Sequence, residues 1–503
     1  MKRSLTNAIG WSCSATWGDR AFSALFNVVF AALLGPRDFG VVAIAMVYVA
    51  FIQMFLEQGL ATALIQRQTL QPKHLDTVFW VNLSSGLVLA GISVSFSSWW
   101  ANINHLPGLA QIIAALSISV PIQGMTIVQF ALLQRDMDFK RLALRSNISV
   151  LIGGSIGIAM AFGGMGVFSL VAQQLVKDLT ALLLLWRVSS WRPGVRFSWK
   201  YLNELLGFSI PTFAVRLANF ADTQAGVALL GVLVGPSAVG LYRLADRLTG
   251  TILSATTGAI QSVSLPEFSR HQNDHAMLRD SVLACLRVST TMTLPAMAGI
   301  ACVSDSLMAA LGPQWVPAAD VLKLLSILGM ILSFALYTGP LLQALAKPGS
   351  LALLVWTRNI VGLGCLVIAG YIVRGGTVYQ QVMGVTLARF AFGVFIVTPF
   401  FLYILLRLSK ISFREFAAPT IPSICSAISI AVSTLALPHF DSFGRRGPIV
   451  ALTAQIIVGG ICGIGTLCAL DPQVRRILRK GLPRRYDLEL AASPELEQQQ
   501  IPR

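Results

Sequence analysis

The sequence is poor in charged residues. Only 12% of its 503 residues are Asp, Glu, Lys or Arg, whereas 55% are hydrophobic. A soluble globular protein carries about 25% charged residues, so this chain lacks the polar surface that would enclose so much apolar material in water. The shortage of charge excludes an ordinary soluble domain and indicates a membrane protein that crosses the bilayer many times.

The sequence also lacks the motifs of cofactor-dependent chemistry. Its seven cysteines include no Cys-x-x-Cys pair, and no glycine-rich phosphate loop follows a predicted strand. No nucleophile lies beside a recognisable general base. The connections between the apolar runs on the predicted outer side of the membrane are too short to hold a catalytic domain. We therefore expect neither a metal nor a cofactor, and we expect no enzymatic activity.

Long apolar runs fill most of the chain. A helix needs about 20 residues to cross a hydrocarbon core of ~30 Å, and runs of this length are helices rather than barrel strands. The expected fold is all-α, with about 14 transmembrane helices. The candidate spans are 7–35, 39–67, 75–101, 109–134, 142–163, 166–186, 202–235, 238–266, 278–304, 318–345, 350–373, 379–406, 416–437 and 447–470.

The basic residues between these spans predict the orientation. Alternate connections carry many cations, among them Arg135, Lys140, Arg141, Arg145, Arg187 and Arg192. The opposite connections carry Arg37, Arg374, Arg445 and Arg446. The positive-inside rule makes the first side cytoplasmic and, with an even number of spans, places both termini there as well. The net charge of +16 is therefore mainly a topology signal, and we expect no nucleic-acid partner.

A short motif occurs twice and predicts an internal repeat. Gly35, Pro36 and Gly40 recur as Gly235, Pro236 and Gly240, at the ends of the first and seventh spans. Six spans separate the copies, so both face the same side, as in parallel transporter repeats. We expect six-helix bundles at 1–190 and 191–410 around a central cleft. Two additional helices at 411–470 and a basic, then polar, cytoplasmic tail at 471–503 complete the chain.

Charged residues inside the spans mark the expected cleft. A charge at the centre of an isolated span costs on the order of 2.5–3.5 kcal/mol, so most of these residues should line water or pair with one another. The cations are Arg20, Lys177, Arg216, Arg243, Arg247, Arg287, Lys323, Arg358 and Arg389, and the anions are Asp19, Glu57, Asp178, Asp222 and Asp246. The excess of cations favours an anionic substrate, and the planar fork of arginine suits phosphate oxygens.

Each of these charges also has a structural interpretation. Arg243, Asp246 and Arg247 stand at helical spacing, so Asp246 can neutralise an arginine. Lys323 and Arg358 lie near span ends and can extend to the interface. Asp19, Glu57 and Asp222, like Asp246, are either counter-charges or sites that couple transport to a cation. The residues alone leave both interpretations open.

Several longer stretches carry a family resemblance. Residues 132–176 read LLQRDMDFKRLALRSNISVLIGGSIGIAMAFGGMGVFSLVAQQLV. Further stretches are FLEQGLATALIQR at 55–67, FSWKYLNELLGFSIP at 197–211, SLPEFSR at 264–270 and LGPQWVPAADVLKLLSILG at 311–329. As a set, from about residue 5 to residue 410, they resemble the polysaccharide transporter family of the multidrug/oligosaccharidyl-lipid/polysaccharide superfamily, and in particular its exporters of colanic-acid and xanthan type.

The resemblance implies a flippase for undecaprenyl-diphosphate-linked oligosaccharide units at the bacterial inner membrane. Its partners would be this lipid-linked oligosaccharide, the bilayer, and the polymerase and export machinery of a polysaccharide pathway. The alternatives are a peptidoglycan-precursor flippase, a multidrug/cation antiporter of the same superfamily, and a membrane-embedded polymerase or glycosyltransferase. An antiporter for organic cations should have an acidic cavity, whereas the cations of this chain outnumber its anions.

Overall fold

The structure is a computed structural model that describes most of the chain. It describes residues 2–56, 60, 64, 70–136, 138–195, 197–202, 217, 220, 224, 226–437, 447–472, 474 and 475, and for residues 2–17, 139, 259, 262 and 348 the backbone alone. These residues form helices and connections, with no strand in the described ranges. The all-α fold expected from the sequence is thus confirmed.

The helices follow one another along the chain in the order of the predicted spans. The first group comprises α1 (Lys2–Leu33), α2 (Pro36–Leu56), α4 (Pro72–Ile103), α5 (Leu109–Ser117), α6 (Ser119–Gly124), α7 (Ile127–Arg135), α8 (Phe139–Phe162) and α9 (Val167–Val188). The second comprises α11 (Pro236–Arg270), α12 (His275–Leu311), the 3₁₀ turn η1 (Pro313–Trp315), α13 (Ala318–Ser333), α14 (Thr338–Ala344), α15 (Pro348–Val373), α16 (Val378–Phe392), the π-turn η2 (Gly393–Val397) and α17 (Thr398–Ser409). The chain continues with α18 (Phe413–Ala417), η3 (Ala418–Thr420), α19 (Ile421–Leu435) and α20 (Gly447–Leu470). We call the first group the first bundle and the second the second bundle.

Most of the predicted spans have a membrane-crossing counterpart. Within the described residues, 10 helices are long and apolar enough to cross a membrane, or up to 11 if a pair bent by 44° between Gly124 and Ile127 forms one span. Helices α1 and α11 are long but carry charges, α1 near its middle at Asp19 and Arg20 and α11 near its start at Arg243, Asp246 and Arg247, which lowers their apolarity. The expected span 202–235 lies largely outside the described residues. The protein is therefore a multi-pass membrane protein, and the count of 14 stays a prediction.

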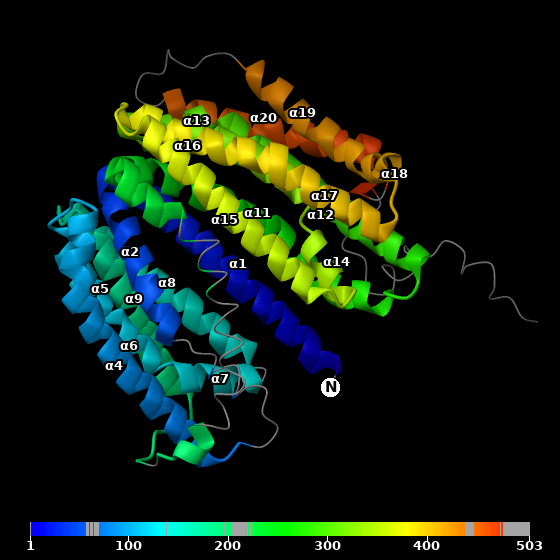
Figure 1. Ribbon diagram of the computed structural model, residues 1–503. Helices are drawn as coiled ribbons and strands as arrows, with labels where there is room; N and C mark the ends of the chain where they lie inside the picture. Colours follow the sequence, from blue (N-terminus) through cyan, green and yellow to red (C-terminus); the bar gives the residue numbers. More distant parts are fainter. Residues whose placement is uncertain are drawn as a thin grey trace, which may run out of the picture.

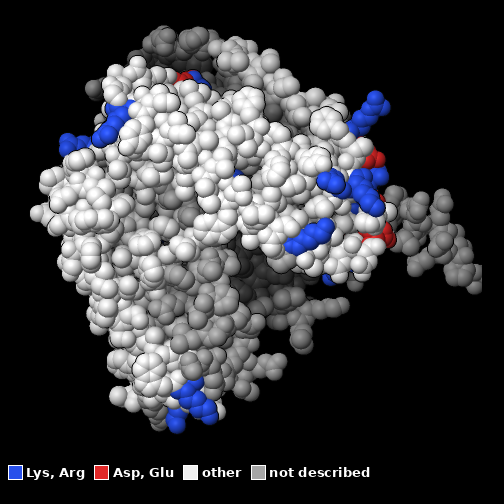
Figure 2. Space-filling model, in the orientation of Figure 1, with Lys and Arg blue, Asp and Glu red and all other residues white. Residues whose placement is uncertain are grey.

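The two bundles meet at one end and diverge toward the other (Figure 1). They approach each other where α2 and α11 begin, and they separate toward the end at which the N-terminus lies. Helices α19 and α20 pack against each other and against α12, on the outside of the second bundle. Most of the visible surface is uncharged, and Lys and Arg gather at its extremities (Figure 2). This distribution fits a protein whose broad sides face lipid.

Glycines on α8 allow close packing inside the first bundle. A Cβ on Gly153 would overlap the backbone of Gln173 on α9, and one on Gly154 would overlap the ring of Phe26 on α1. Gly157, one turn further along, meets α9 in the same way. Small residues let backbones approach each other in a membrane, where lipid competes for every apolar contact. The glycine-rich stretch of the family resemblance is therefore a helix-packing surface.

The repeated Gly-Pro motif forms the contact between the bundles. Helices α2 and α11 both begin at the proline of the motif, whose missing N–H is tolerated at the first helical position. The second glycine of each copy then faces the other helix. A Cβ on Gly40 would overlap the carbonyl oxygen of Pro236, and a Cβ on Gly240 would overlap that of Pro36. The two copies thus cross each other as related, mutually fitting surfaces.

A buried tryptophan strengthens the same end of the interface. Trp315, at the end of η1, is fully buried, and its Nε1 donates a hydrogen bond of 2.5 Å to the carbonyl oxygen of Ala31 on α1. Its ring meets Phe39 of α2 edge to face, with centroids 5.3 Å apart. A second-bundle residue therefore fills the space between α1 and α2. Together with the Gly40–Gly240 crossing, it closes the end at which the bundles meet.

Candidate functional site

Three cavities lined by described residues lie in and between the bundles, and they share lining residues. One of about 410 Å³ lies in the first bundle, one of about 420 Å³ lies between the bundles, and one of about 440 Å³ lies in the second bundle. We call them the first-bundle, central and second-bundle cavities. Lys177 lines both the first-bundle and the central cavity, and Arg243 lines both the central and the second-bundle cavity. The three therefore adjoin one another across the width of the protein.

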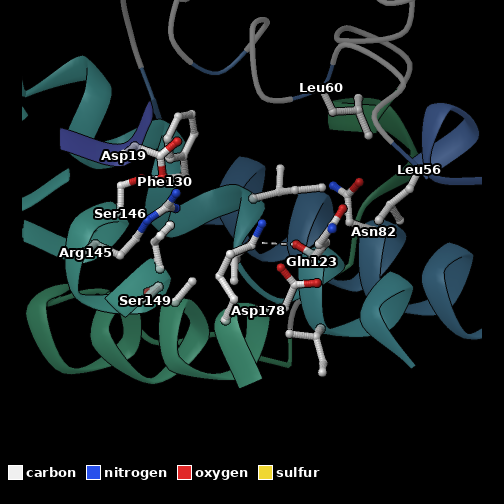
Figure 3. Close-up of a pocket in the computed structure, with 16 residues that line it drawn as sticks. Asp19, Leu56, Leu60, Asn82, Gln123, Phe130, Arg145, Ser146, Ser149 and Asp178 are labelled. Atoms are coloured by element: carbon white, nitrogen blue, oxygen red, sulfur yellow. Dashed lines mark hydrogen bonds between the residues drawn. The ribbon is translucent and has the colours of Figure 1, made fainter. Parts of the chain in front are cut away.

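The first-bundle cavity holds two anions and two cations. Asp19 from α1, Arg145 from α8, and Lys177 and Asp178 from α9 all line it, and Figure 3 shows Asp19, Arg145 and Asp178 around a common space with Gln123. Asp19 accepts a hydrogen bond of 2.9 Å from the Ser146 hydroxyl. Among the described lining residues the charges balance, which favours a neutral, hydrated site over one that binds a strong anion.

Side-chain contacts fix the charged groups of this cavity. Nε2 of Gln174 donates to both oxygens of Asp178, at 3.1 and 3.0 Å. The guanidinium of Arg145 lies 5.4 Å from the ring centroid of Phe130, and its buried Nε has no hydrogen-bond partner among the described residues. The sequence assigned Arg145 to a cytoplasmic loop. That assignment is wrong, because α8 begins at residue 139 and carries Arg145 into the bundle.

The central cavity is cationic and rich in amides. Its lining includes Lys177, Arg243 and Arg247, and no Asp or Glu stands among its described lining residues. The amide side chains that line it are Asn27, Gln53, Gln173, Gln174 and Gln224. Helices α1, α2, α6, α8 and α9 contribute on one side, and α11 and Gln224 on the other. Both bundles thus supply polar groups to one space beneath the α2–α11 crossing.

Arg247 is the cation of this cavity best placed to meet a ligand. Its side chain is exposed, and it forms no ion pair with any residue in the part of the chain that the structure describes. Arg243, one turn earlier on α11, is instead held by Asp246 at 3.6 Å and donates to Oε1 of Gln224 at 3.2 Å. The i, i+3 pairing that the sequence predicted for Arg243 and Asp246 is therefore present.

The second-bundle cavity holds three arginines and one aspartate. Arg243 and Asp246 come from α11, Arg358 from α15 and Arg389 from α16. Asp246 lies between two of the arginines, since its Oδ2 is 3.6 Å from Arg243 and its Oδ1 is 3.3 Å from Arg389. Arg389 also donates to the hydroxyl of Tyr242 and lies over its ring. Among the described lining residues, the arginines outnumber the carboxylates.

Three predicted substrate-binding residues lie apart from these cavities. Arg287 forms a two-pronged ion pair with Asp471 at the end of α20, at 2.7 and 3.3 Å. Lys323 pairs with Asp305 at 2.7 Å and with Asp320 at 3.2 Å. Arg20 lines none of the three cavities, and a Cβ on Gly258 of α11 would lie 3.8 Å from its guanidinium. Arg216, Glu57 and Asp222 lie outside the described residues.

The amides were not predicted from the sequence. A charge inside a span predicts a site because burying it is costly. Gln53, Gln173 and Gln224 carry no charge, so their position within an apolar run is a weaker signal. A search for Asn and Gln at helical spacing with the charges would have found Gln173 and Gln174, which precede Lys177 by one turn. The grouping across both bundles depends on tertiary structure.

Comparison with known proteins agrees with this architecture. The polysaccharide biosynthesis protein family matches residues 29–320. The succinoglycan biosynthesis transport protein ExoT of Rhizobium meliloti is 28% identical over 92% of this chain and 91% of its own length. The lipopolysaccharide biosynthesis protein WzxC of Escherichia coli is 25% identical over 67% of this chain and 69% of its own length.

Solved structures show the same fold. The lipid II flippase MurJ, in an inward closed conformation, superposes with a TM-score of 0.71 and 15% identity over 92% of this chain and 99% of MurJ. An inward-facing multidrug resistance transporter of the MATE family gives a TM-score of 0.60 and 16% identity, over 78% of this chain and 95% of the transporter. The chain therefore belongs to the polysaccharide biosynthesis protein family, in agreement with the family resemblance of its sequence.

Proposed function

We propose that the protein is a flippase that carries a diphosphate-linked oligosaccharide, attached to a polyprenyl lipid, across the bacterial inner membrane. The observation that carries the proposal is the central cavity between the bundles. Three cations and no described carboxylate line it, so it suits a strongly anionic head group. One relative named for succinoglycan transport and another named for lipopolysaccharide biosynthesis support the same substrate class.

The cations of the cavity can replace the water lost by a diphosphate. Arg247 is exposed and unpaired among the described residues, and an arginine fork binds two phosphate oxygens at once. Lys177 adds a point charge from the opposite bundle. Charges supplied by both bundles bring the halves together on the substrate, which links binding to movement of one bundle relative to the other.

The amides of the cavity suit the sugars. Each Asn or Gln presents one acceptor and two donor hydrogens, which match the hydroxyl groups of a sugar. Five such side chains line the cavity alongside the cations. They would hold the first sugars of the oligosaccharide beside the diphosphate. An amide-rich lining also tolerates different sugars, since a hydroxyl can donate to it or accept from it.

The arrangement of the bundles fits alternating access. The bundles are closed at the α2–α11 crossing and diverge toward the N-terminal end, which the basic loops predict to be cytoplasmic. A head group would enter from that side while the polyprenyl tail stays in lipid. Opening of the crossing would then expose the head group on the outer side. An ion gradient or removal of the product by a polymerase would supply the free energy.

The two alternative carriers predict different substrates. A cation antiporter needs acidic groups where its substrate binds, and the described lining of the central cavity has none. A peptidoglycan-precursor flippase would also need a cationic cavity, so the geometry alone does not separate it from an oligosaccharide flippase. The named relatives favour the oligosaccharide.

The proposed function predicts a specific cellular defect. Deletion of the gene should stop export of one polysaccharide and leave its lipid-linked repeat unit on the inner leaflet. Arg247→Gln should fail to restore export, because loss of a charged hydrogen bond costs about 1.5–3 kcal/mol, or about 10- to 150-fold in affinity. Polymer yield and lipid-linked intermediates, extracted and separated by chromatography, measure both effects.

A matched control separates substrate binding from general loss of charge. Arg374 is exposed at the end of α15, away from the cavities, so Arg374→Gln should restore export fully. Normal polymer in the deletion strain, without a second exporter, would overturn the flippase function. Full restoration of export by Arg247→Gln would overturn the role of the central cavity.

A further inference from the structure

A buried hydroxyl in the wall of the first-bundle cavity has no partner among the described residues. Ser149 of α8 lines this cavity and is 2% exposed, and its Oγ makes no hydrogen bond within the described part of the chain. A serine inside a helix can donate to the carbonyl oxygen one turn earlier, as Ser117 and Ser326 do at 2.7 Å. An unsatisfied buried hydroxyl destabilises a fold. Its place in a cavity wall therefore points to a partner that enters the cavity.

A second unsatisfied group lies one turn earlier on the same helix. The buried Nε of Arg145 has no hydrogen-bond partner among the residues that the structure describes. Residues i and i+4 of a helix share one face, and Arg145 and Ser149 both line the first-bundle cavity. Figure 3 shows them on one side of the space, with Gln123 and Asn82 across from them. A ligand in this cavity would meet a donor and a hydroxyl that no described residue uses.

The charged groups of the cavity disfavour an ion as the ligand. Asp19 and Asp178 line it together with Arg145 and Lys177. An anion would face the two carboxylates, and a cation would face the guanidinium and the ammonium group. An uncharged molecule with several hydroxyl groups meets no like charge, because each hydroxyl can donate to a carboxylate or accept from a cation. An uncharged sugar of the transported oligosaccharide is a molecule of this kind.

The cavity is within reach of the central site. Lys177 and Val150 line both spaces, so a head group whose diphosphate lies beside Arg247 can continue into the first bundle. The volume of about 410 Å³ falls in the range of about 300–1,000 Å³ that is common for small-molecule sites. The space is therefore large enough for a sugar ring.

We infer that the first-bundle cavity binds an uncharged sugar of the transported head group, beyond the sugar attached to the diphosphate, with Ser149 Oγ and Arg145 Nε among its hydrogen-bonding groups. The inference rests on the proposed function and extends it, since the amides of the central cavity already serve the sugars beside the diphosphate. The protein would then distinguish a complete oligosaccharide from an incomplete one, because only the longer head group reaches the first bundle.

Protection of a cysteine by the natural substrate tests this site. In a protein whose native cysteines are replaced, Ala181→Cys places a thiol in the first-bundle cavity and Ala43→Cys places one in the central cavity. Membranes come from cells that make the complete lipid-linked unit, only its first sugar, or no unit, and the rate of labelling by N-ethylmaleimide is measured. The complete unit should slow labelling at both positions several-fold. The first sugar alone should slow it only at Ala43→Cys.

Ser149→Ala tests the hydroxyl itself. It removes a group that bonds to no described residue, so the melting temperature of the purified protein should not fall. Protection of Ala181→Cys by the complete unit should weaken by about 2- to 10-fold, the value of one hydrogen bond. Ser326→Ala is the matched control, because this buried serine lines none of the three cavities and should leave the protection unchanged. A Ser149→Ala protein that melts lower and is protected as before would show a structural role instead.

Other outcomes overturn the inference and separate it from the proposed function. Equal protection of Ala181→Cys by the first sugar alone would show that no further sugar is needed to fill the first bundle. A thiol at this position that reacts in none of the membranes would show that the cavity is closed to ligands. In membranes without the lipid-linked unit, protection by sodium ions or by glucuronate, and not by glucose, would assign the cavity to an ion. A complete unit that does not protect Ala43→Cys either would contradict the proposed function itself.

Discussion

The arginines within the membrane-spanning part differ in what neutralises them. Arg247 faces the central cavity without an ion pair among the described residues, whereas Arg287 is held by both oxygens of Asp471. In the sequence, each of the two residues is a cation within an apolar run. Their roles diverge because Asp471 lies 184 residues further along the chain, and no local pattern connects the two.

Arg287 should therefore be a structural residue. Arg287→Gln would remove the arginine from its ion pair with Asp471, whose side chain is 2% exposed. Breaking such a pair costs about 3–5 kcal/mol, so the melting temperature of the solubilised protein should fall by several degrees. The double variant Arg287→Gln with Asp471→Asn removes both charges and should recover most of the loss.

The comparison with Arg247 makes this prediction specific. Arg247→Gln should abolish export with little change in melting temperature, because no partner is left uncompensated. An Arg287→Gln protein that is as stable as the unaltered one but inactive would instead place Arg287 in the substrate path. A recovery of the melting temperature when Asp471→Asn is added to Arg287→Gln is explained only by an ion pair between the two residues.

Helix positions were predictable where a span is uniformly apolar. The run 447–470 coincides with α20, and the run 350–373 nearly coincides with α15. The run 109–134 is instead divided into α5, α6 and α7, with a 44° bend. Its apolar composition continues through the bend, so hydropathy alone could not show it. Pro121, which lies within α6, was a signal only for the break between α5 and α6, because a proline disturbs the turn that precedes it.

The Gly-Pro repeat was predictable as a repeat but not as a contact. Two copies on one side of the membrane follow from the number of spans between them. That the copies cross each other requires the bundles to be related by an axis that passes between α2 and α11. Both positions need glycine, because a Cβ on Gly40 or Gly240 would overlap the backbone of the other helix.

A larger side chain at the α2–α11 crossing should hold the bundles apart. Gly40→Val would separate α2 from α11, so Ala43→Cys, whose position lines the central cavity one turn further in, should become reachable from outside. An impermeant maleimide should label Ala43→Cys in the Gly40→Val protein but not in the protein with Gly40. Export should stop, because the outer side can no longer close.

Gly91 provides the matched control. It also lies in a membrane-spanning helix, α4, but a Cβ there would meet nothing within 4 Å. Gly91→Val should therefore leave both labelling and export unchanged. Continued protection of Ala43→Cys in the Gly40→Val protein, together with normal export, would show that the crossing is not the outer closure.

At the scale of the whole molecule, one end of the protein is closed and the opposite end is open between the bundles. The α2–α11 crossing and Trp315 seal one end, and the bundles diverge toward the other. Which end faces the cytoplasm follows from the charges of the loops rather than from the packing. The orientation is thus the part of the mechanism for which the sequence supplies the main evidence.

Labelling of single cysteines tests that orientation. Arg37, next to the crossing, and Arg141, at the start of α8, are both exposed, and Val195 in the connection between the bundles is 94% exposed. In a protein whose native cysteines are replaced, an impermeant maleimide should label Arg37→Cys in intact cells. It should label Arg141→Cys and Val195→Cys only after the membrane is permeabilised, because the positive-inside rule places their basic loops in the cytoplasm.

The result of this labelling decides whether the proposed direction of transport is possible. If Arg141→Cys is labelled in intact cells and Arg37→Cys is not, the diverging end of the bundles opens outward. The cationic central cavity would then receive its substrate from outside, and the protein could not accept a lipid-linked oligosaccharide assembled on the inner leaflet in this conformation.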